Sequence, residues 1–225
     1  GLNTIDGSNY VDAQRSQYVV PDKVIASVGY YIPFRHKGLL RGTHLNLFYS
    51  GYSASGYSFA YTNDMNGDGI NNDMMYIPKD DSEIKFKNEA DRTAFWNFVD
   101  QDSYLKNHKG EYAEAYAARA PWVHRFDLRI TEDFSFKAGK TEHHFQLSLD
   151  FMNIGNMINS KWGVMKNASS SNGCRILKYE GMDDNKTPIF SMYKINGEYP
   201  TETYSYNRIY TECWKMQVGI RYIFN

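Results

Sequence analysis

The stretch "WKMQVGIRYIFN", residues 214–225, decides the fold because its side chains alternate between apolar and polar along almost its whole length. The apolar row is Trp214, Met216, Val218, Ile220, Tyr222 and Phe224. The other row is polar or small apart from Ile223, and contains Lys215, Gln217, Gly219, Arg221 and Asn225. A period of two predicts a β-strand with one apolar and one polar face.

The same alternation returns in four earlier segments, residues 23–34, 43–50, 124–136 and 144–153. Phe48 interrupts one polar row, and the others carry charges, among them Arg125, Asp127, Arg129 and Asp150. Two interpretations remain open at this point. In a soluble β-sandwich the apolar row faces a core and the charges face water. In a transmembrane β-barrel the apolar row faces lipid and the polar row faces a lumen.

The connections between these segments favour the barrel. Two connections are short, residues 35–42 and 137–140, and two are long, about 51–122 and 154–212. Short and long connections therefore alternate, as do the periplasmic turns and extracellular loops of outer-membrane barrels. A soluble domain rarely carries loops of this length without a functional reason.

Composition excludes some classes of protein. Among 225 residues, 25 Lys and Arg balance 26 Asp and Glu, so no basic excess predicts a nucleic-acid partner. Aromatic residues make up 16%, which suits alternating strands, and no apolar run reaches the roughly 20 residues of a membrane helix. The opening "GLNTIDGSNY" has no initiator Met and reads as loop, so we expect a fragment or processed product.

The C-terminal strand resembles the β-signal read by the machinery that inserts barrels into the outer membrane. The residues that carry this resemblance are Gln217, Gly219, Tyr222 and Phe224. Asn225 departs from the pattern because it follows the final aromatic residue. The alternative is that these residues form an ordinary amphipathic terminal strand.

Five further stretches resemble the C-terminal part of a TonB-dependent outer-membrane transporter of the Bacteroidetes type, Oar-like and related to SusC-like receptors. They are "NGDGINNDMMYIP" (66–78), "FWNFVDQDSYLKNHKGEYAE" (95–114), "ARAPWVHRFDLRI" (118–130), "LDFMNIGNMINSKWG" (149–163) and "GIRYIF" (219–224). The resemblance implies an all-β fold: residues 1–225 would supply about five main strands of a 22-stranded transmembrane antiparallel β-barrel, with long extracellular loops and one short loop helix. It covers most of the chain after residue 51.

The resemblance also implies a function and partners. The chain would serve TonB-dependent uptake of a nutrient ligand across the bacterial outer membrane. Its partners would be the remainder of the same barrel and plug, the TonB complex through an N-terminal part, outer-membrane lipid and, as an open alternative, a surface lipoprotein. We expect no enzymatic activity, because no serine-hydrolase, zinc-protease or phosphate-loop motif occurs. A secreted aromatic-rich β-sandwich binding module and an outer-membrane barrel hydrolase remain alternatives.

The stretch "NDMNGDGINND", residues 63–73, begins like a calcium loop. Side-chain oxygens at alternate positions and one backbone carbonyl could hold Ca²⁺, supplied by Asp64, Asn66, Asp68, Ile70 and Asp73. The usual closing glutamate is missing, because Met75 stands at the twelfth position, so Asp73 would replace it. The alternative is a turn closed by bonds from its Asp and Asn side chains to the backbone.

The two long loops should contain structure of their own. Asn88 and Asp91 predict the start of a helix whose apolar stripe includes Phe95 and Phe98, with Gly110 as its stop. "CRILKY" (174–179) and "IFSMYKI" (189–195) predict a hairpin. The two cysteines of the chain, Cys174 and Cys213, could form one disulfide or remain free thiols.

Overall fold

The computed structural model describes residues 4–7, 9–10, 13–16, 18–34, 39–54, 56–168 and 174–224, with the side chain of Phe224 left aside. The chain divides into two compact units. Unit 1 comprises residues 1–20, 54–121 and 166–205, and unit 2 comprises 21–53, 122–165 and 206–225. Strands predominate, so the predicted all-β class is confirmed.

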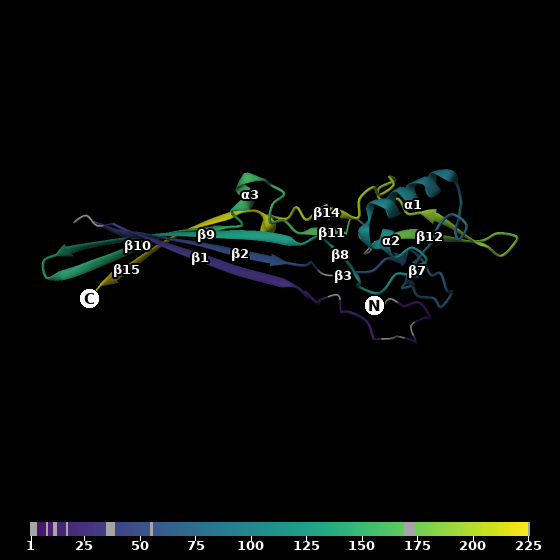
Figure 1. The fold of residues 1–225 in the computed structure, drawn as a ribbon, viewed down its shortest axis with the longest axis horizontal. Coiled ribbons are helices and arrows are strands. Elements are labelled where there is room, and N and C mark those ends of the chain that lie inside the picture. The colour runs from purple at the N-terminus through teal and green to yellow at the C-terminus, as the bar shows by residue number, and fades with distance from the viewer. Residues whose placement is uncertain are drawn as a thin grey trace. The chain divides into compact units, whose positions relative to one another are not determined.

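Unit 2 is built on one five-stranded antiparallel sheet of order β1-β2-β9-β10-β15 (Figure 1). Its strands are β1 (Lys23–Pro33), β2 (Leu40–Tyr52), β9 (Val123–Ala138), β10 (Thr141–Met152) and β15 (Lys215–Phe224). All five predicted strands are therefore confirmed. In the described part of the chain the sheet is open, because β1 and β15 each pair with a single neighbour.

The strand register keeps the two predicted faces separate across the whole sheet. Ile130 lies opposite Leu45 on one side and Leu149 on the other, and Leu149 in turn faces Val218. One residue earlier in β9, Arg129 lies between residues of the polar rows of β2 and β10. Directly paired residues share a face, so five local patterns combine into one apolar and one polar surface.

Unit 1 contains most of the two long predicted loops together with residues 1–20. A four-stranded sheet of order β4-β12-β13-β6 is formed by β4 (Ala60–Tyr61), β12 (Arg175–Met182), β13 (Pro188–Met192) and β6 (Lys85–Phe86). The predicted hairpin is confirmed, because β12 and β13 pair in antiparallel fashion. Three short ribbons complete the strands: β3 (Gly56–Tyr57) with β8 (Ala118–Arg119), β5 (Tyr76–Ile77) with β7 (Glu111–Tyr112), and β11 (Lys166–Ala168) with β14 (Tyr204–Tyr206).

The predicted helix is present but shorter than expected. Helix α1 (Glu89–Gln101) starts where the Asn88 side chain accepts a hydrogen bond from the Asp91 N–H at 2.9 Å. It ends before Gly110, because Asp102 is extended and its side chain caps a second helix, α2 (Ser103–Asn107). Unit 2 adds the short helices α3 (Gly155–Ile158) and η1 (Tyr210–Glu212).

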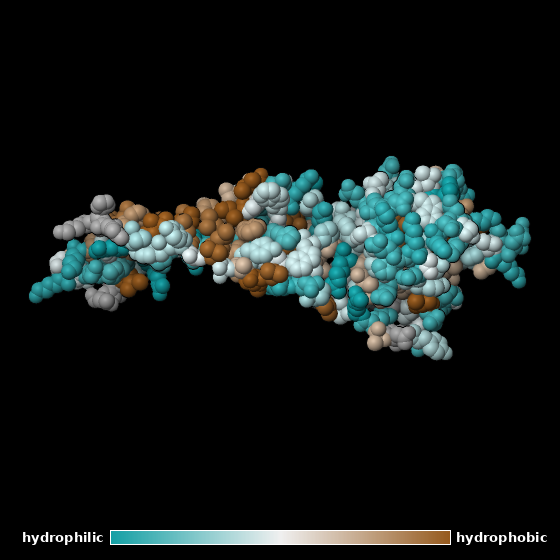
Figure 2. Space-filling model, viewed as in Figure 1, coloured by the Kyte–Doolittle hydropathy of each residue, from teal (hydrophilic) through white to brown (hydrophobic). Residues whose placement is uncertain are grey.

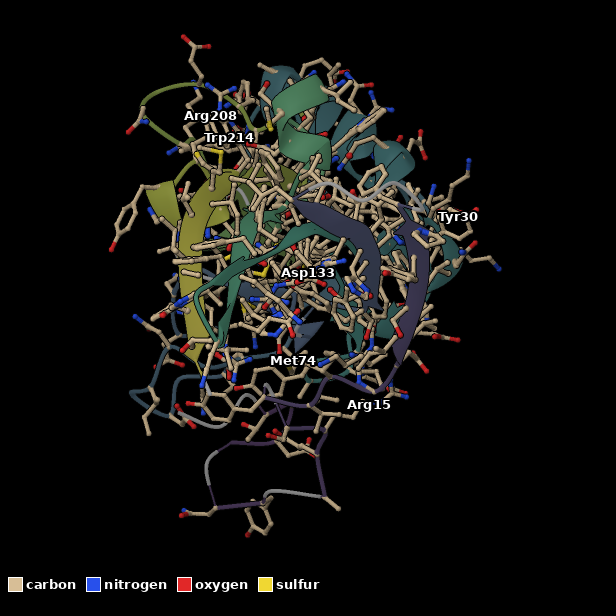
Figure 3. All side chains as sticks on the ribbon, turned by 90° about the vertical axis from the view of Figure 1, so that its left-hand side faces the viewer. Arg15, Tyr30, Met74, Asp133, Arg208 and Trp214 are labelled. Atoms are coloured by element: carbon tan, nitrogen blue, oxygen red, sulfur yellow. The ribbon has the colours of Figure 1, made fainter. Side chains whose placement is uncertain are left out.

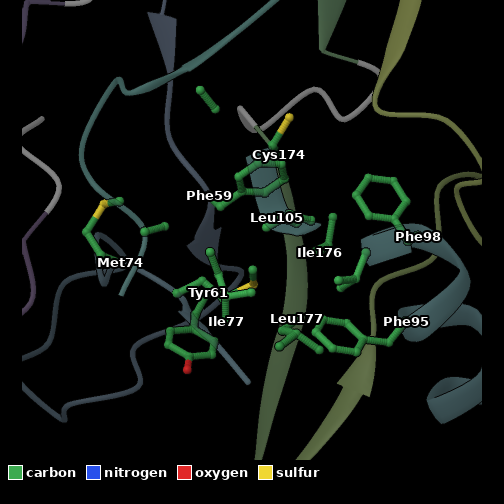
Figure 4. Packing of buried hydrophobic residues seen from close by; sticks show 14 of the residues in the cluster. Phe59, Tyr61, Met74, Ile77, Phe95, Phe98, Leu105, Cys174, Ile176 and Leu177 are labelled. Carbon is green, nitrogen blue, oxygen red and sulfur yellow. The ribbon is translucent and has the colours of Figure 1, made fainter. Parts of the chain in front are cut away.

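The hydrophobic core lies in unit 1. Every buried hydrophobic residue of the described chain except Val123 belongs to this unit. Figure 4 shows Phe59, Phe95 and Leu177 in this cluster, and none of the three side chains is exposed. The apolar residues of the unit 2 sheet thus have no comparable core among the described residues.

Candidate functional site

The apolar face of the unit 2 sheet is exposed along its length. Val28 is 67% exposed and Ile220 is 76% exposed, although both lie inside strands. In Figure 2, hydrophobic surface gathers over these strands. Exposed apolar surface of this extent marks a face that is covered by a partner or by lipid.

Aromatic side chains lie at both ends of this apolar face. At the end with the long connections, the ring centroids of Tyr49 and Phe126 lie 5.0 Å apart. At the end with the short turns, Phe145 stacks on Tyr222 with centroids 4.6 Å apart and on Phe136 at 5.9 Å. Paired aromatic girdles bound the lipid-facing band of transmembrane barrels.

The spacing of these clusters fits a bilayer. Phe126 and Phe136 are ten positions apart on β9, which is about 34 Å along a strand at a rise of ~3.4 Å per residue. A strand tilt of about 40° reduces this to roughly 26 Å, close to the ~25 Å apolar band of outer-membrane barrels. Glu132 departs from the apolar pattern: it lies on this face opposite Leu147, where it accepts a hydrogen bond from the Thr43 hydroxyl.

The polar face carries a cross-strand network. Arg129 Nε lies 2.8 Å from an Asp150 carboxylate oxygen. Asp133 lies 3.1 Å from the His44 ring and accepts a bond from the Gln146 amide at 2.8 Å. Figure 3, which looks along the sheet, shows the strands as an arc with Asp133 inside it and Tyr30 outside. The polar face is therefore concave and the apolar face convex.

A second polar cluster lies on the polar face near the long connections. The buried Asn153 donates through Nδ2 to the Gly163 carbonyl at 3.2 Å and to the Glu212 carbonyl at 2.9 Å. Arg125 donates to the same Gly163 carbonyl at 2.9 Å and pairs with the Glu212 carboxylate. The Asp127 carboxylate accepts the Asn153 backbone N–H at 2.7 Å. These bonds attach the segments after β10 and before β15 to the polar face of β9.

Sequence reasoning placed Arg125 and Asp127 on the polar face but assigned no side-chain role to residues 153–163, and so missed how this cluster is connected. A signal existed in the repeated asparagine of "NIGN", residues 153–156, directly after a strand. Asn153 has φ +53, a left-handed conformation that asparagine adopts more readily than most residues. Its partner Glu212 lies far away in sequence, so no local pattern connects the two.

In the loop of residues 63–73, called the Asp/Asn loop below, backbone N–H groups donate hydrogen bonds to the Asp and Asn side chains. The Asp64 carboxylate accepts bonds from the N–H groups of Gly67 and Gly69, both at 2.7 Å. Asp68 accepts the Ile70 N–H at 2.8 Å, and Asn66 accepts the Asp68 N–H at 2.9 Å. These are the bonds expected of the turn alternative. In the parts of the chain that the structure covers, no three His, Cys, Asp or Glu side chains form a metal-binding group.

Asp73 contributes differently to this loop. Only 3% of it is exposed, and its Oδ2 accepts the N–H groups of Met65 at 2.6 Å and Asn66 at 3.3 Å. Its Oδ1 is buried without a hydrogen-bond partner within the described ranges. Burial raises the pKa of this carboxyl, and the nearby Asp64 and Asp68 raise it further. Calcium binding by these residues and by the Ile70 carbonyl stays a prediction.

The residues of the β-signal lie on β15, the last strand of the sheet. Gly219 faces Ser148, whose Oγ would lie only 2.6 Å from a Cβ at this position. Gln217 faces Asp150 on the polar side, and Tyr222 stacks on Phe145. The position of these residues beside an open edge is compatible with a signal, and the signal itself stays a prediction.

Both cysteines are free thiols in the structure. Cys174 is buried in the unit 1 core, where burial raises its thiol pKa, and Cys213 is exposed in unit 2. Their pairing stays a prediction.

No helix in the described ranges combines the length and apolar character needed to cross a membrane. No protein-family model, curated protein or solved structure matches the chain.

Proposed function

We propose that the chain supplies the last strands and two long extracellular loops of a 22-stranded TonB-dependent receptor in the bacterial outer membrane. In this function, the five-stranded sheet is part of the barrel wall. Its convex apolar face contacts lipid, and its concave polar face lines the lumen occupied by the plug. The complete receptor takes up a nutrient ligand, using energy delivered by TonB.

The exposed apolar face of an otherwise ordered sheet is the observation that carries this proposal. Fully burying one Val or Leu side chain contributes about 1.5–3 kcal/mol, so a whole row of exposed ones is unfavourable in water. Lipid removes this cost, and the aromatic clusters at both ends suit the two membrane interfaces.

The open edges support a larger barrel. Unpaired backbone groups at β1 and β15 would cost several kcal/mol each in hydrocarbon. Both edges must therefore pair with further strands if this sheet lies in a membrane. The remainder of the same receptor would supply those strands, and unit 1 would offer a surface to a lipoprotein outside the cell.

A secreted β-sandwich binding module is the second candidate. It would need another layer over the apolar face, and residues such as Val28 and Ile220 remain exposed. Nothing in the described residues specifically favours an outer-membrane hydrolase.

Site-directed labelling tests the facing of the sheet. We would place single cysteines at Leu149 and Ser148, neighbours on β10, in a receptor without its native cysteines. A lipid-phase quencher should reach a fluorophore at position 149 and not one at 148. Equal quenching, or quenching only at 148, would refute the barrel-wall assignment.

Uptake itself needs a separate test. A strain without the receptor should lose growth on the nutrient that the receptor imports, and removal of TonB should have the same effect. Uptake that survives the loss of TonB would rule out the proposed energy source.

A further inference from the structure

A hollow of about 410 Å³ opens in unit 2 between the segment that follows β10 and the segment that precedes β15. Its apolar and aromatic walls include Val164, Tyr206 and Tyr210, and its polar walls include Lys161 and Arg208. Its volume falls within the range of small-molecule sites, which are mostly apolar with a few placed polar groups.

Buried hydrogen bonds hold the walls of this hollow in place. Asn156 lines the hollow and is only 9% exposed. Its Nδ2 donates to the carbonyls of Ser160 at 3.0 Å and Trp162 at 3.2 Å, and its Oδ1 accepts the Trp214 N–H at 3.2 Å. One amide therefore connects both segments, so the hollow is formed before any ligand arrives.

The charges around the hollow are unbalanced. Lys161 and Arg208 line it, and neither forms an ion pair within the described residues. Lys215 lies nearby, with its Nζ 5.7 Å from the ring of a lining tyrosine. Glu212 is the single carboxylate among the described lining residues, and Arg125 already neutralises it. The described lining residues consequently carry an excess of positive charge.

We propose that this hollow binds the anionic group of a small organic ligand whose aromatic or aliphatic body contacts the tyrosine walls. Lys161 and Arg208 would attract the anion, and Tyr206 and Tyr210 would cover the apolar part of the ligand. The inference deepens the proposed function and rests on it, because it names the class of ligand that the receptor would carry.

Cys213 provides a built-in reporter, since it lines the hollow and is exposed. We would treat the complete receptor in detergent with two thiosulfonates that share a reactive group, one bearing a sulfonate and the other a trimethylammonium. Modification of Cys213 would be followed by mass spectrometry and normalised to free cysteine. The anionic reagent should react at least about threefold faster at low salt, and the preference should shrink at high salt.

Variants test whether Lys161 and Arg208 cause the preference for the anionic reagent. Combining Lys161→Gln with Arg208→Gln should abolish the preference, while Lys161→Arg should keep it. Combining Lys137→Gln with Lys140→Gln, which removes the same number of charges at the opposite end of the sheet, is the matched control and should leave the preference unchanged. If the wild type shows no anionic preference, or if the double variant retains it, the inference is wrong.

Protection experiments test the ligand class. Benzoate in the millimolar range should slow the reaction of Cys213 with a neutral maleimide, whereas its uncharged counterpart benzamide should protect less. Equal protection by both, or no protection by benzoate, would overturn the proposal. Neither assay uses TonB or transport, so a failure here is distinguishable from a failure of the uptake function.

Discussion

Asp73 carries a carboxylate that is almost fully buried, with one oxygen unpaired in the described structure. Its pKa is raised above the ordinary 3.8, first by burial and then by Asp64 and Asp68. A carboxyl with a higher pKa in the folded state contributes stability that is fully present below its unfolded pKa. That contribution is lost as pH rises through the folded pKa. At neutral pH, the loop therefore carries a cost that a bound cation could remove.

Replacing Asp73 by Asn tests this cost. The amide oxygen can still accept both N–H bonds, but the charge is gone. Without divalent ions, we expect amides in residues 59–76 of the variant to be better protected from hydrogen exchange at pH 7 than in wild type. This difference in protection between the variant and wild type should vanish towards pH 4. Asp184→Asn, a change at an exposed position in another turn, is the control.

Calcium distinguishes the two interpretations of this loop. If the loop holds an ion, added calcium should increase protection of residues 59–76 in wild type and have little effect in Asp73→Asn. If added calcium leaves the hydrogen-exchange protection of both proteins unchanged, the turn alternative is sufficient. Faster exchange of the variant at pH 7 without calcium would contradict the buried-charge argument itself.

At the scale of elements, the two faces of strand β15 differ in chemistry. Val218 is 55% exposed on the apolar face, opposite Leu149. Gln217, its neighbour, faces Asp150 on the polar side. If the apolar face contacts lipid, adjacent positions of the same strand should respond very differently to a new charge.

We therefore expect Val218→Lys to impair membrane assembly and Gln217→Lys to be tolerated. A lysine on the lipid face near the bilayer midplane costs about 2–4 kcal/mol, whereas one on the lumen face can approach the Asp150 carboxylate. The assembled fraction can be measured as heat-modifiable migration on gels. Equal losses for the two variants would mean that β15 is not a wall strand.

At the scale of the whole molecule, the two units are stabilised in different ways. Unit 1 has a dry core in which Phe59, Phe95 and Leu177 are fully buried. Unit 2 relies on backbone pairing and a polar network, and the described apolar residues of its sheet are exposed or half-buried apart from Val123. A protein with both properties suits a position where one part lies in water and the other in a membrane.

Epitope insertion tests the orientation that this implies. A tag placed between Asp184 and Asn185, in the turn between β12 and β13, should bind antibody on intact cells. A tag after Gly139, in the turn between β9 and β10, should bind only after the outer membrane is permeabilised. Surface labelling of the second tag alone would reverse the proposed topology. Surface labelling of both tags would refute it.

The sequence alone was sufficient to predict the strands of the unit 2 sheet, their two faces and several local features. Alternating side chains point to opposite faces because of strand geometry, so the rows around Arg129 and Ile130 could be read without knowing any neighbour. The Asn88 cap and the hairpin of β12 and β13 are equally local, since their partners lie a few residues away.

Only the tertiary structure decided which distant residues meet. The amide of Asn153 bonds the carbonyl of Glu212, and Asn156 bonds Trp214, across long connections whose path no periodicity encodes. The same holds for Asp73, whose burial depends on the assembly of unit 1 from three separate stretches of the chain. Side-chain direction within a strand follows from covalent geometry, whereas these contacts depend on how the loops close, and that is determined by packing over the whole unit.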